Sequence, residues 1–365
     1  MTKQPYLRVA GMCLALLSPV FAQNTASSTA SSQPQPATSQ LIIYHAGSLT
    51  AAFTKIEAAF MAEHPGVAIV DKFGGSVNLA RQVTVGGEPA DLYASADYED
   101  IDVLLKPKWA DYTIRFAQGA MVLVYKINDP NPLAKVDAIA DPGVPFNPNS
   151  YPPAIPNVSP DWYKMLSQPG VRIGGGDPST DPGIYRGLLI MQLAEKYYRQ
   201  PGLYKALYKN DTYHEGDKTP AAPADARSLI DRSDYHFAYE HGALATARTD
   251  PNVRLARLPA EIGMSDSSME SLYAQVSLSI SGLASDDPHV TITGSRVTWG
   301  ITLLNKSMNT ANAIAFLQFL LTPGKGGALE QTTGPEPILP AVVSQDDYAR
   351  IPDVLRPLVR TISQR

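Results

Sequence analysis

Residues 41–60, LIIYHAGSLTAAFTKIEAAF, join a short apolar segment directly to an amphipathic one. Leu41–Tyr44 predicts a β-strand, and the turn His45–Ser48 leads into a segment whose apolar residues recur at helical spacing. Those apolar residues are Leu49, Phe53, Ile56 and Phe60. The same order returns at 67–83, where VAIV and FGGS precede VNLARQV. Two strand–turn–helix units in succession predict parallel strands joined by helices, which is an α/β fold.

Each unit places a serine at the carboxyl end of a strand, the edge at which open α/β sheets bind ligands. Ser48, which follows Gly47, and Ser76 stand where the two helices should begin. We therefore expect each serine to cap its helix. The backbone N–H groups of a first helical turn have no partner within the helix, and with the helix dipole they attract anions.

A third helix start lies in residues 174–187, GGGDPSTDPGIYRG. Asp181 is a good N-cap, Pro182 suits the first helical position, and Gly183 follows. With three such N-termini, the sequence predicts an anion site made of backbone N–H groups and serine hydroxyls. Because a carboxylate repels a bound oxyanion, Asp181 either caps its helix and points away or binds the central atom of the ligand.

Chain length, net charge and the absence of known motifs exclude several classes of function. A chain of 365 residues is long enough for two domains, and its net charge of -5 argues against nucleic acid and anionic membranes as partners. The sequence holds no G-x-S-x-G elbow, Walker loop or H-E-x-x-H motif, and the glycines at 174–176 lack the spacing of a dinucleotide site. We expect no cofactor and no catalysis, and we interpret His45 as structural or as supporting the nearby site.

The first residues predict export. Lys3 and Arg8 precede an apolar run that ends at Ala22, which is typical of a signal peptide over residues 1–22 and implies a periplasmic or extracellular protein. The only cysteine, Cys13, lies inside it. Residues 23–40 are polar and uncharged, and we expect a disordered linker there.

Further strands are expected at 91–95, 120–125, 171–173, 235–239, 255–258, 276–280, 290–293 and 297–304. The proline-rich residues 128–160 predict an irregular connection. Tyr239 ends one of the strands and could donate its phenolic O–H into a cleft.

Four segments together resemble the archaeal-type molybdate/tungstate-binding proteins of ABC transporters: 42–67, 73–83, 90–98 and 181–198. The strand W-G-I-T at 299–302 belongs to the same pattern, and its most specific elements are H-A-G-S-L-T at 45–50 and D-P-x-x-Y-R at 181–186. The resemblance implies two lobes, each with a mixed, mainly parallel sheet flanked by helices, which close on one tetra-oxyanion in the hinge cleft. It also implies a membrane permease as partner.

The resemblance assigns the site residue by residue. Gly47 and Ser48 would form one anion-binding turn, and Ser76 a second. Asp181, Pro182 and Gly183 would form the third contact, and Tyr239 would be a donor on the opposite lobe. The resemblance implies that Asp181 binds the molybdenum or tungsten centre directly.

One departure concerns a second carboxylate. The family pattern has a glutamate shortly before the strand that carries the tyrosine, whereas Ala222 or Pro223 stands there in this chain. The acidic residues nearby, Glu215, Asp217 and Asp225, are out of register. The coordination number at the metal and the preferred oxyanion therefore stay open.

For the domains we predict lobe one over 41–118 and 306–350, lobe two over 119–305, and a C-terminal tail over 351–365. The crossovers would lie near Gly119 and Asn305, and we expect a monomer. Three alternatives to molybdate or tungstate uptake stay open. They are a binder of sulfate, phosphate or a small organic anion, a secreted hydrolase that uses Asp181 with a histidine, and a sensory or adhesive domain.

Overall fold

The computed structural model describes residues 39–214, 226–328 and 334–362. The predicted signal peptide lies outside these residues, as does the predicted linker up to residue 38. Ser39 and Gln40, assigned above to the linker, instead begin the first strand. The segment 215–225, which includes Ala222 and Pro223 at the position of the family's glutamate, also lies outside the described residues. Among the residues described, no helix is both long and apolar enough to cross a bilayer.

Seven strands form the sheet of the first lobe, in the order β13-β12-β4-β11-β3-β1-β2. Their bounds are β1 Ser39–Ala46, β2 Val67–Gly74, β3 Leu92–Ser95, β4 Ile114–Gln118, β11 Thr298–Leu303, β12 Glu336–Ser344 and β13 Val359–Ile362. β1 runs parallel to β2 and β3, whereas β11 runs antiparallel to β3 and β4. The predicted parallel pairing of the first two strands is therefore confirmed.

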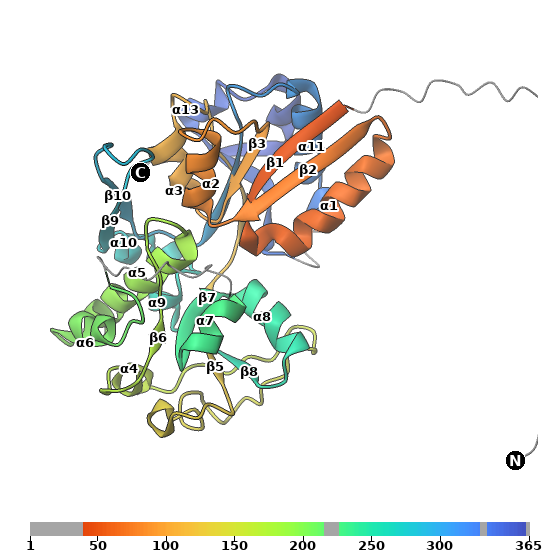
Figure 1. Cartoon of the computed structure of the whole chain (residues 1–365). Coiled ribbons are helices and arrows are strands. Elements are labelled where there is room, and N and C mark those ends of the chain that lie inside the picture. Colours follow the sequence, from red (N-terminus) through yellow and green to blue (C-terminus); the bar gives the residue numbers. More distant parts are fainter. Residues whose placement is uncertain (1–38, 215–225, 329–333, 363–365) are drawn as a thin grey trace, which may run out of the picture. The chain divides into compact units, whose positions relative to one another are not determined.

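Helices flank this sheet, and Figure 1 shows α1 running beside β2. They are α1 Thr50–Glu63, α2 Ser76–Val83, α3 Tyr98–Asp100 continuing into η2 Ile101–Leu105, α11 Thr310–Leu321 and α13 Gln345–Tyr348. α1 and α11 meet through aromatic rings. The ring centroid of Phe316 lies 6.1 Å from that of Phe53 and 5.3 Å from that of Phe60, and all three side chains are fully buried.

The second lobe has a four-stranded sheet in the order β6-β7-β5-β8, and Figure 1 shows α7 and α8 next to it. Its strands are β5 Met121–Lys126, β6 Ile173–Gly174, β7 Tyr235–Tyr239 and β8 Val253–Arg257. Its helices are α4 Trp162–Leu166, α5 Pro182–Tyr197, α6 Leu203–Lys209, α7 Ala226–Arg232, α8 Glu240–Thr249, α9 Ala260–Gly263 and α10 Glu270–Tyr273. A separate hairpin pairs β9 Ser277–Ile280 with β10 Val290–Thr293.

The sheets are mixed, as predicted, but not mainly parallel. In the second sheet only β6 and β7 run parallel, while β5 lies antiparallel to both β7 and β8. β7 and β8 are joined by α8 and run in the same direction on either side of β5, which enters from β4 of the other sheet and runs the opposite way.

The strand pairings change the boundaries that we propose for the lobes. β11 pairs with β3 and β4, so residues 298–303 belong with the first sheet although the sequence assigned them to lobe two. Residues 353–362, predicted as a tail, form η5 Asp353–Leu358 and the edge strand β13. We therefore propose that the first crossover lies at Gly119 and that the second lies between β10 and β11 rather than near Asn305.

The aromatic contact between α1 and α11 supports a stability prediction. Phe316→Ala should lower the free energy of unfolding by about 3–5 kcal/mol, because it leaves a cavity among packed rings. Val354→Ala, at a position that is 44% exposed, is the control and should change the free energy by less than about 0.5 kcal/mol. Urea unfolding followed by circular dichroism would measure both, and an equal effect of the two substitutions would contradict the packing described.

Candidate functional site

Ser76 holds the loop after β3 rather than capping α2. The N-cap of α2 is Gly75, which has no side chain to cap with, so the predicted capping by Ser76 is wrong. The Ser76 hydroxyl oxygen instead accepts a hydrogen bond from the backbone N–H of Ala96 at 3.1 Å, and the residue is fully buried. The hydroxyl hydrogen of Ser76 is not donated to any group among the described residues.

Ser48 likewise does not cap its helix. It lies in a 3₁₀ turn, η1 Gly47–Leu49, which precedes α1, and the N-cap position is Leu49. The Ser48 hydroxyl oxygen accepts from the indole Nε1–H of Trp299 at 3.0 Å. The side chain of Ser48 is therefore tied to β11, and its hydroxyl hydrogen, like that of Ser76, makes no bond within the described part of the chain.

Asp181 is the N-cap that the sequence predicted. Its carboxylate accepts from the backbone N–H of Gly183 at 2.7 Å, and Pro182 occupies the first turn of α5. The same carboxylate also accepts from the backbone N–H of Ser76 at the start of α2. Burial raises the pKa of Asp181 to about 6, against the lowering effect of these two N–H groups.

The start of α2 lies directly against the segment before α5. A Cβ on Gly75 would come within 2.6 Å of the carbonyl oxygen of Thr180, so only glycine allows this approach. The N–H of Asn78 donates to that same carbonyl at 3.2 Å, and Arg81 donates to the carbonyl of Ser179 at 2.5 Å. Oxygens of the chain itself thus accept from the N–H groups that the sequence predicted for an anion.

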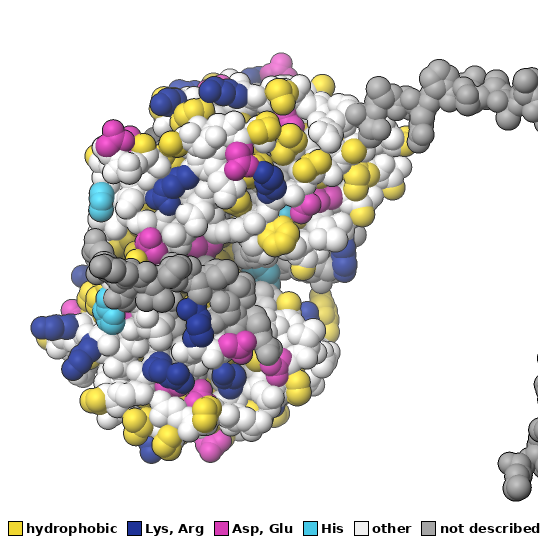
Figure 2. Space-filling model, in the orientation of Figure 1, with side chains coloured by type: hydrophobic (Ala, Val, Ile, Leu, Met, Phe, Trp, Pro, Cys, Tyr) yellow, Lys and Arg dark blue, Asp and Glu magenta, His cyan; other side chains and the backbone are white. Residues whose placement is uncertain are grey.

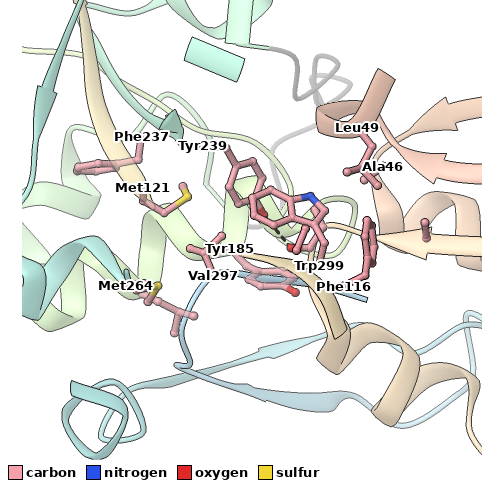
Figure 3. Packing of buried hydrophobic residues seen from close by; sticks show 14 of the residues in the cluster. Ala46, Leu49, Phe116, Met121, Tyr185, Phe237, Tyr239, Met264, Val297 and Trp299 are labelled. Atoms are coloured by element: carbon pink, nitrogen blue, oxygen red, sulfur yellow. Dashed lines mark hydrogen bonds between the residues drawn. The ribbon is translucent and has the colours of Figure 1, made fainter. Parts of the chain in front are cut away.

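Tyr239 closes the same region from the end of β7. Figure 3 shows its ring next to the indole of Trp299, and the two ring centroids are 4.9 Å apart. Its hydroxyl lies 3.5 Å from the carbonyl oxygen of Ala96, the residue whose N–H binds Ser76. The structure therefore brings the predicted residues together, through Trp299 and Ala96.

A buried ion pair beside this region escaped the sequence analysis. Arg186 of α5 donates to the Asp97 carboxylate at 2.7 Å, and neither side chain is more than 1% exposed. Tyr185 donates to Asp97 at 2.9 Å and to Asp100 at 3.1 Å. Burial and the charge of Asp97 raise the pKa of Asp100 well above its usual range. The sequence shows Tyr185 and Arg186 in the motif D-P-x-x-Y-R, but it does not indicate which acidic residues they contact.

Comparison with known proteins decides the family. Residues 41–332 match the model of the bacterial extracellular solute-binding proteins. The chain belongs to this family. Its members are solute-binding components of ABC transporters, which supports a binding protein rather than a hydrolase that uses Asp181.

Two relatives show the extent of the similarity. An uncharacterized solute-binding protein of Methanoculleus marisnigri is 29% identical over 340 residues, which are 88% of this chain and 86% of the relative. The molybdate/tungstate-binding protein WtpA of Pyrococcus abyssi is 28% identical over 346 residues, covering 88% of this chain and 90% of WtpA.

Solved structures share the fold of this solute-binding protein. The sulfate-binding protein SubI of Mycobacterium tuberculosis aligns with a TM-score of 0.55 at 18% identity, covering 82% of this chain and 87% of SubI. The periplasmic molybdate-binding protein of Azotobacter vinelandii aligns with a TM-score of 0.50 at 16% identity, covering 82% and 99%. These alignments confirm the predicted two-lobed architecture of periplasmic binding proteins.

The buried ion pair leads to a prediction about stability. Arg186→Met should lower the free energy of unfolding by about 3–5 kcal/mol, because it leaves the Asp97 carboxylate buried without its cation. Lys164→Met is the control, because it removes an ion pair at the surface, in which the side chains of Lys164 and Asp161 are both 59% exposed. It should lower the free energy of unfolding by less than about 1 kcal/mol. Guanidinium unfolding would measure both, and a loss below about 1 kcal/mol for Arg186→Met would contradict this account.

The raised pKa of Asp181 leads to a second prediction. Its folded-state pKa of about 6 lies above the ordinary value of 3.8, so protonation of Asp181 stabilises the fold below about pH 4, and this contribution is lost as the pH rises through 6. Asp181→Asn keeps an N-cap without the titration. Without ligand, the variant should gain stability over the parent between pH 4 and pH 7, by up to about 3 kcal/mol.

Urea unfolding of both proteins at a series of pH values measures this difference, which cancels the titration of all other groups. A difference that stays constant from pH 4 to pH 7 would show that Asp181 has an ordinary pKa.

Proposed function

We propose that this protein binds molybdate or tungstate outside the cytoplasmic membrane and delivers it to the permease of an ABC importer. The observation that carries the proposal is the position of the Asp181 carboxylate, which accepts from N–H groups at the starts of both α2 and α5. Two helix N-termini therefore converge on one anionic group. The carboxylate oxygens stand in for two oxygens of a bound oxyanion.

Further hydrogen-bond donors, none of them an unpaired cation, belong to the site proposed around the Asp181 carboxylate. The hydroxyl groups of Ser48 and Ser76 each accept one bond from the protein and have a hydrogen left to donate. The nearby guanidinium of Arg186 is already neutralised by Asp97. Basic and acidic side chains are interspersed on the face that Figure 2 shows, in keeping with a ligand held by local donors rather than by a basic surface.

Asp181 favours a metal-centred oxyanion over sulfate or phosphate. We propose that the ligand's oxygens take over the N–H groups of Ser76 and Gly183, while the carboxylate of Asp181 turns to the central atom. Molybdenum and tungsten can accept this extra oxygen, whereas the sulfur of sulfate cannot, so that Asp181 would only repel sulfate. The similarity to the molybdate/tungstate-binding protein WtpA over most of both chains supports the same choice.

Calorimetric titration of residues 23–365 with molybdate, tungstate, sulfate and phosphate tests the proposal. We expect molybdate and tungstate to bind with one site per chain at micromolar concentration or below, and sulfate and phosphate to bind far more weakly. Absence of molybdate and tungstate binding in this range would refute the proposal. Sulfate binding that is equally tight would refute the role given to Asp181.

Single substitutions test which side chains contact the oxyanion. Ser48→Ala and Ser76→Ala should each weaken molybdate binding by about 1–3 kcal/mol, since each removes a hydrogen bond to a charged ligand. Ser167→Ala is the control, because this exposed hydroxyl donates only to the carbonyl of Lys164. Asp181→Asn should weaken molybdate binding and strengthen sulfate binding. Unchanged molybdate affinity in Asp181→Asn would mean that Asp181 serves only as a helix cap.

A further inference from the structure

Three side chains of the first lobe bring ligating atoms together on the face of the sheet that α1 covers. They are His45 at the end of β1, Glu57 of α1 and Asp71 of β2, and one ligand atom from each lies within 4.8 Å of the other two. The imidazole Nε2 of His45 is 3.5 Å from an Asp71 carboxylate oxygen. None of the three belongs to the donor set proposed for the oxyanion.

The register of the strands explains the arrangement. β1 and β2 are parallel, with Ile43 opposite Asp71 and His45 opposite Phe73. Residues two apart on a strand point to the same face, so His45 and Asp71 share the face on which Ile43 packs. Glu57 follows one helical turn after Phe53 on the buried side of α1, so its carboxylate reaches the same place.

These atoms are hydrogen-bond acceptors that lack a donor. His45 Nδ1 lies 2.9 Å from the carbonyl oxygen of Ala46, and since a carbonyl can only accept, the ring proton must be on Nδ1. Nε2 therefore presents a lone pair toward the Asp71 carboxylate. His45 Nε2 and Glu57 Oε1 are both buried, at 0% and 6% exposure of their residues, and neither has a partner among the described residues.

Such an arrangement is costly without a cation. A buried polar atom without a partner destabilises the fold, and facing acceptors add repulsion. Burial lowers the pKa of His45, which disfavours a charged imidazolium at this position. Burial and the charge of Asp71 raise the pKa of Glu57 to about 8, so a carboxylate at this position is unfavourable unless a cation accompanies it.

We propose that His45, Glu57 and Asp71 form a binding site for a divalent transition-metal cation, with Zn²⁺ as the best match. One neutral imidazole and two carboxylates are ligands that Zn²⁺ accepts, and together the two carboxylates neutralise its charge. In a tetrahedral zinc site, ligand atoms about 2.1 Å from the ion are about 3.4 Å apart, close to the 3.5 Å between His45 and Asp71. Water would complete the coordination.

Two features prepare the site for an ion. The bond from His45 Nδ1–H to Ala46 orients the ring and fixes the tautomer, as is usual for histidines that bind metals. The Asp71 side chain is 39% exposed, so it can move to bring all three atoms within coordination distance and gives the ion a route from solvent. A bound ion would join β1, β2 and α1 immediately before the turn Gly47–Ser48.

Titration of tag-free, chelator-treated protein with ZnCl₂, in the absence of any oxyanion, tests the site. We expect one high-affinity site per chain and a rise in melting temperature on saturation. Asp71→Asn, at an exposed position, and Glu57→Gln, which keeps the shape of the side chain, should each weaken Zn²⁺ binding at least about tenfold and remove the rise. Binding of Co²⁺ to the parent protein should produce visible absorption bands that both variants lose.

Glu63→Gln and His64→Ala are matched controls from the same helix and its C-cap, and both should bind Zn²⁺ like the parent. The proposal is overturned if the parent shows no saturable binding below about 0.1 mM, or if the controls lose as much affinity as Asp71→Asn and Glu57→Gln. Because oxyanions are absent, the result is independent of molybdate binding.

Discussion

The buried ion pair between Arg186 and Asp97 determines where the parts of the candidate oxyanion site lie. A guanidinium and a carboxylate that are both withdrawn from water are tolerable only together, so α5 of the second lobe is held to the loop after β3 of the first. Asp181 caps the same helix, five residues before Arg186. Ala96, the residue before Asp97, holds Ser76 and meets Tyr239. Donors from both lobes are thus positioned by neighbours of one ion pair.

The same ion pair sets the electrostatics of the proposed site. Since Asp97 neutralises Arg186, this buried cation contributes little net attraction to an anion, and the whole chain carries a charge of -5. Affinity must then come from short-range hydrogen bonds, whose strength depends on the exclusion of water. Such a site selects by geometry and protonation state, because a ligand that carries its own proton would set a donor against a donor.

The first strands and helices of the fold could be predicted because neighbouring residues determine them. Residues 41–83 carry both the apolar periodicity and the turn residues of a βαβ unit, and the Asp181-Pro182 start of α5 is a capping signal written in adjacent residues. The sheet membership of β11 was missed, since nothing in residues 298–303 indicates that they pair with β3 and β4. Pairing across so long a separation is a tertiary property.

The candidate site shows the same division. The sequence located Ser48 and Ser76 at helix starts but gave the wrong partners, because these are Trp299 and Ala96, contacts made only when the chain folds. Arg186 was quoted within a motif without a function, since its partner Asp97 is distant in sequence. His45 was interpreted as structural or as supporting the nearby site, and its relation to Asp71 depends on a strand register that one segment cannot reveal.

The contact between Ser48 and Trp299 gives this protein a built-in optical signal. Of its three tryptophans, Trp162 bonds to Tyr198 and Trp109 lies beside Lys108 and Lys306, whereas Trp299 touches both Ser48 and Tyr239. Its indole N–H and its ring are therefore in contact with Ser48 and Tyr239, two of the residues expected to donate to the oxyanion. The emission of Trp299 should report occupancy directly, so that binding can be followed in the unlabelled chain on the timescale of mixing.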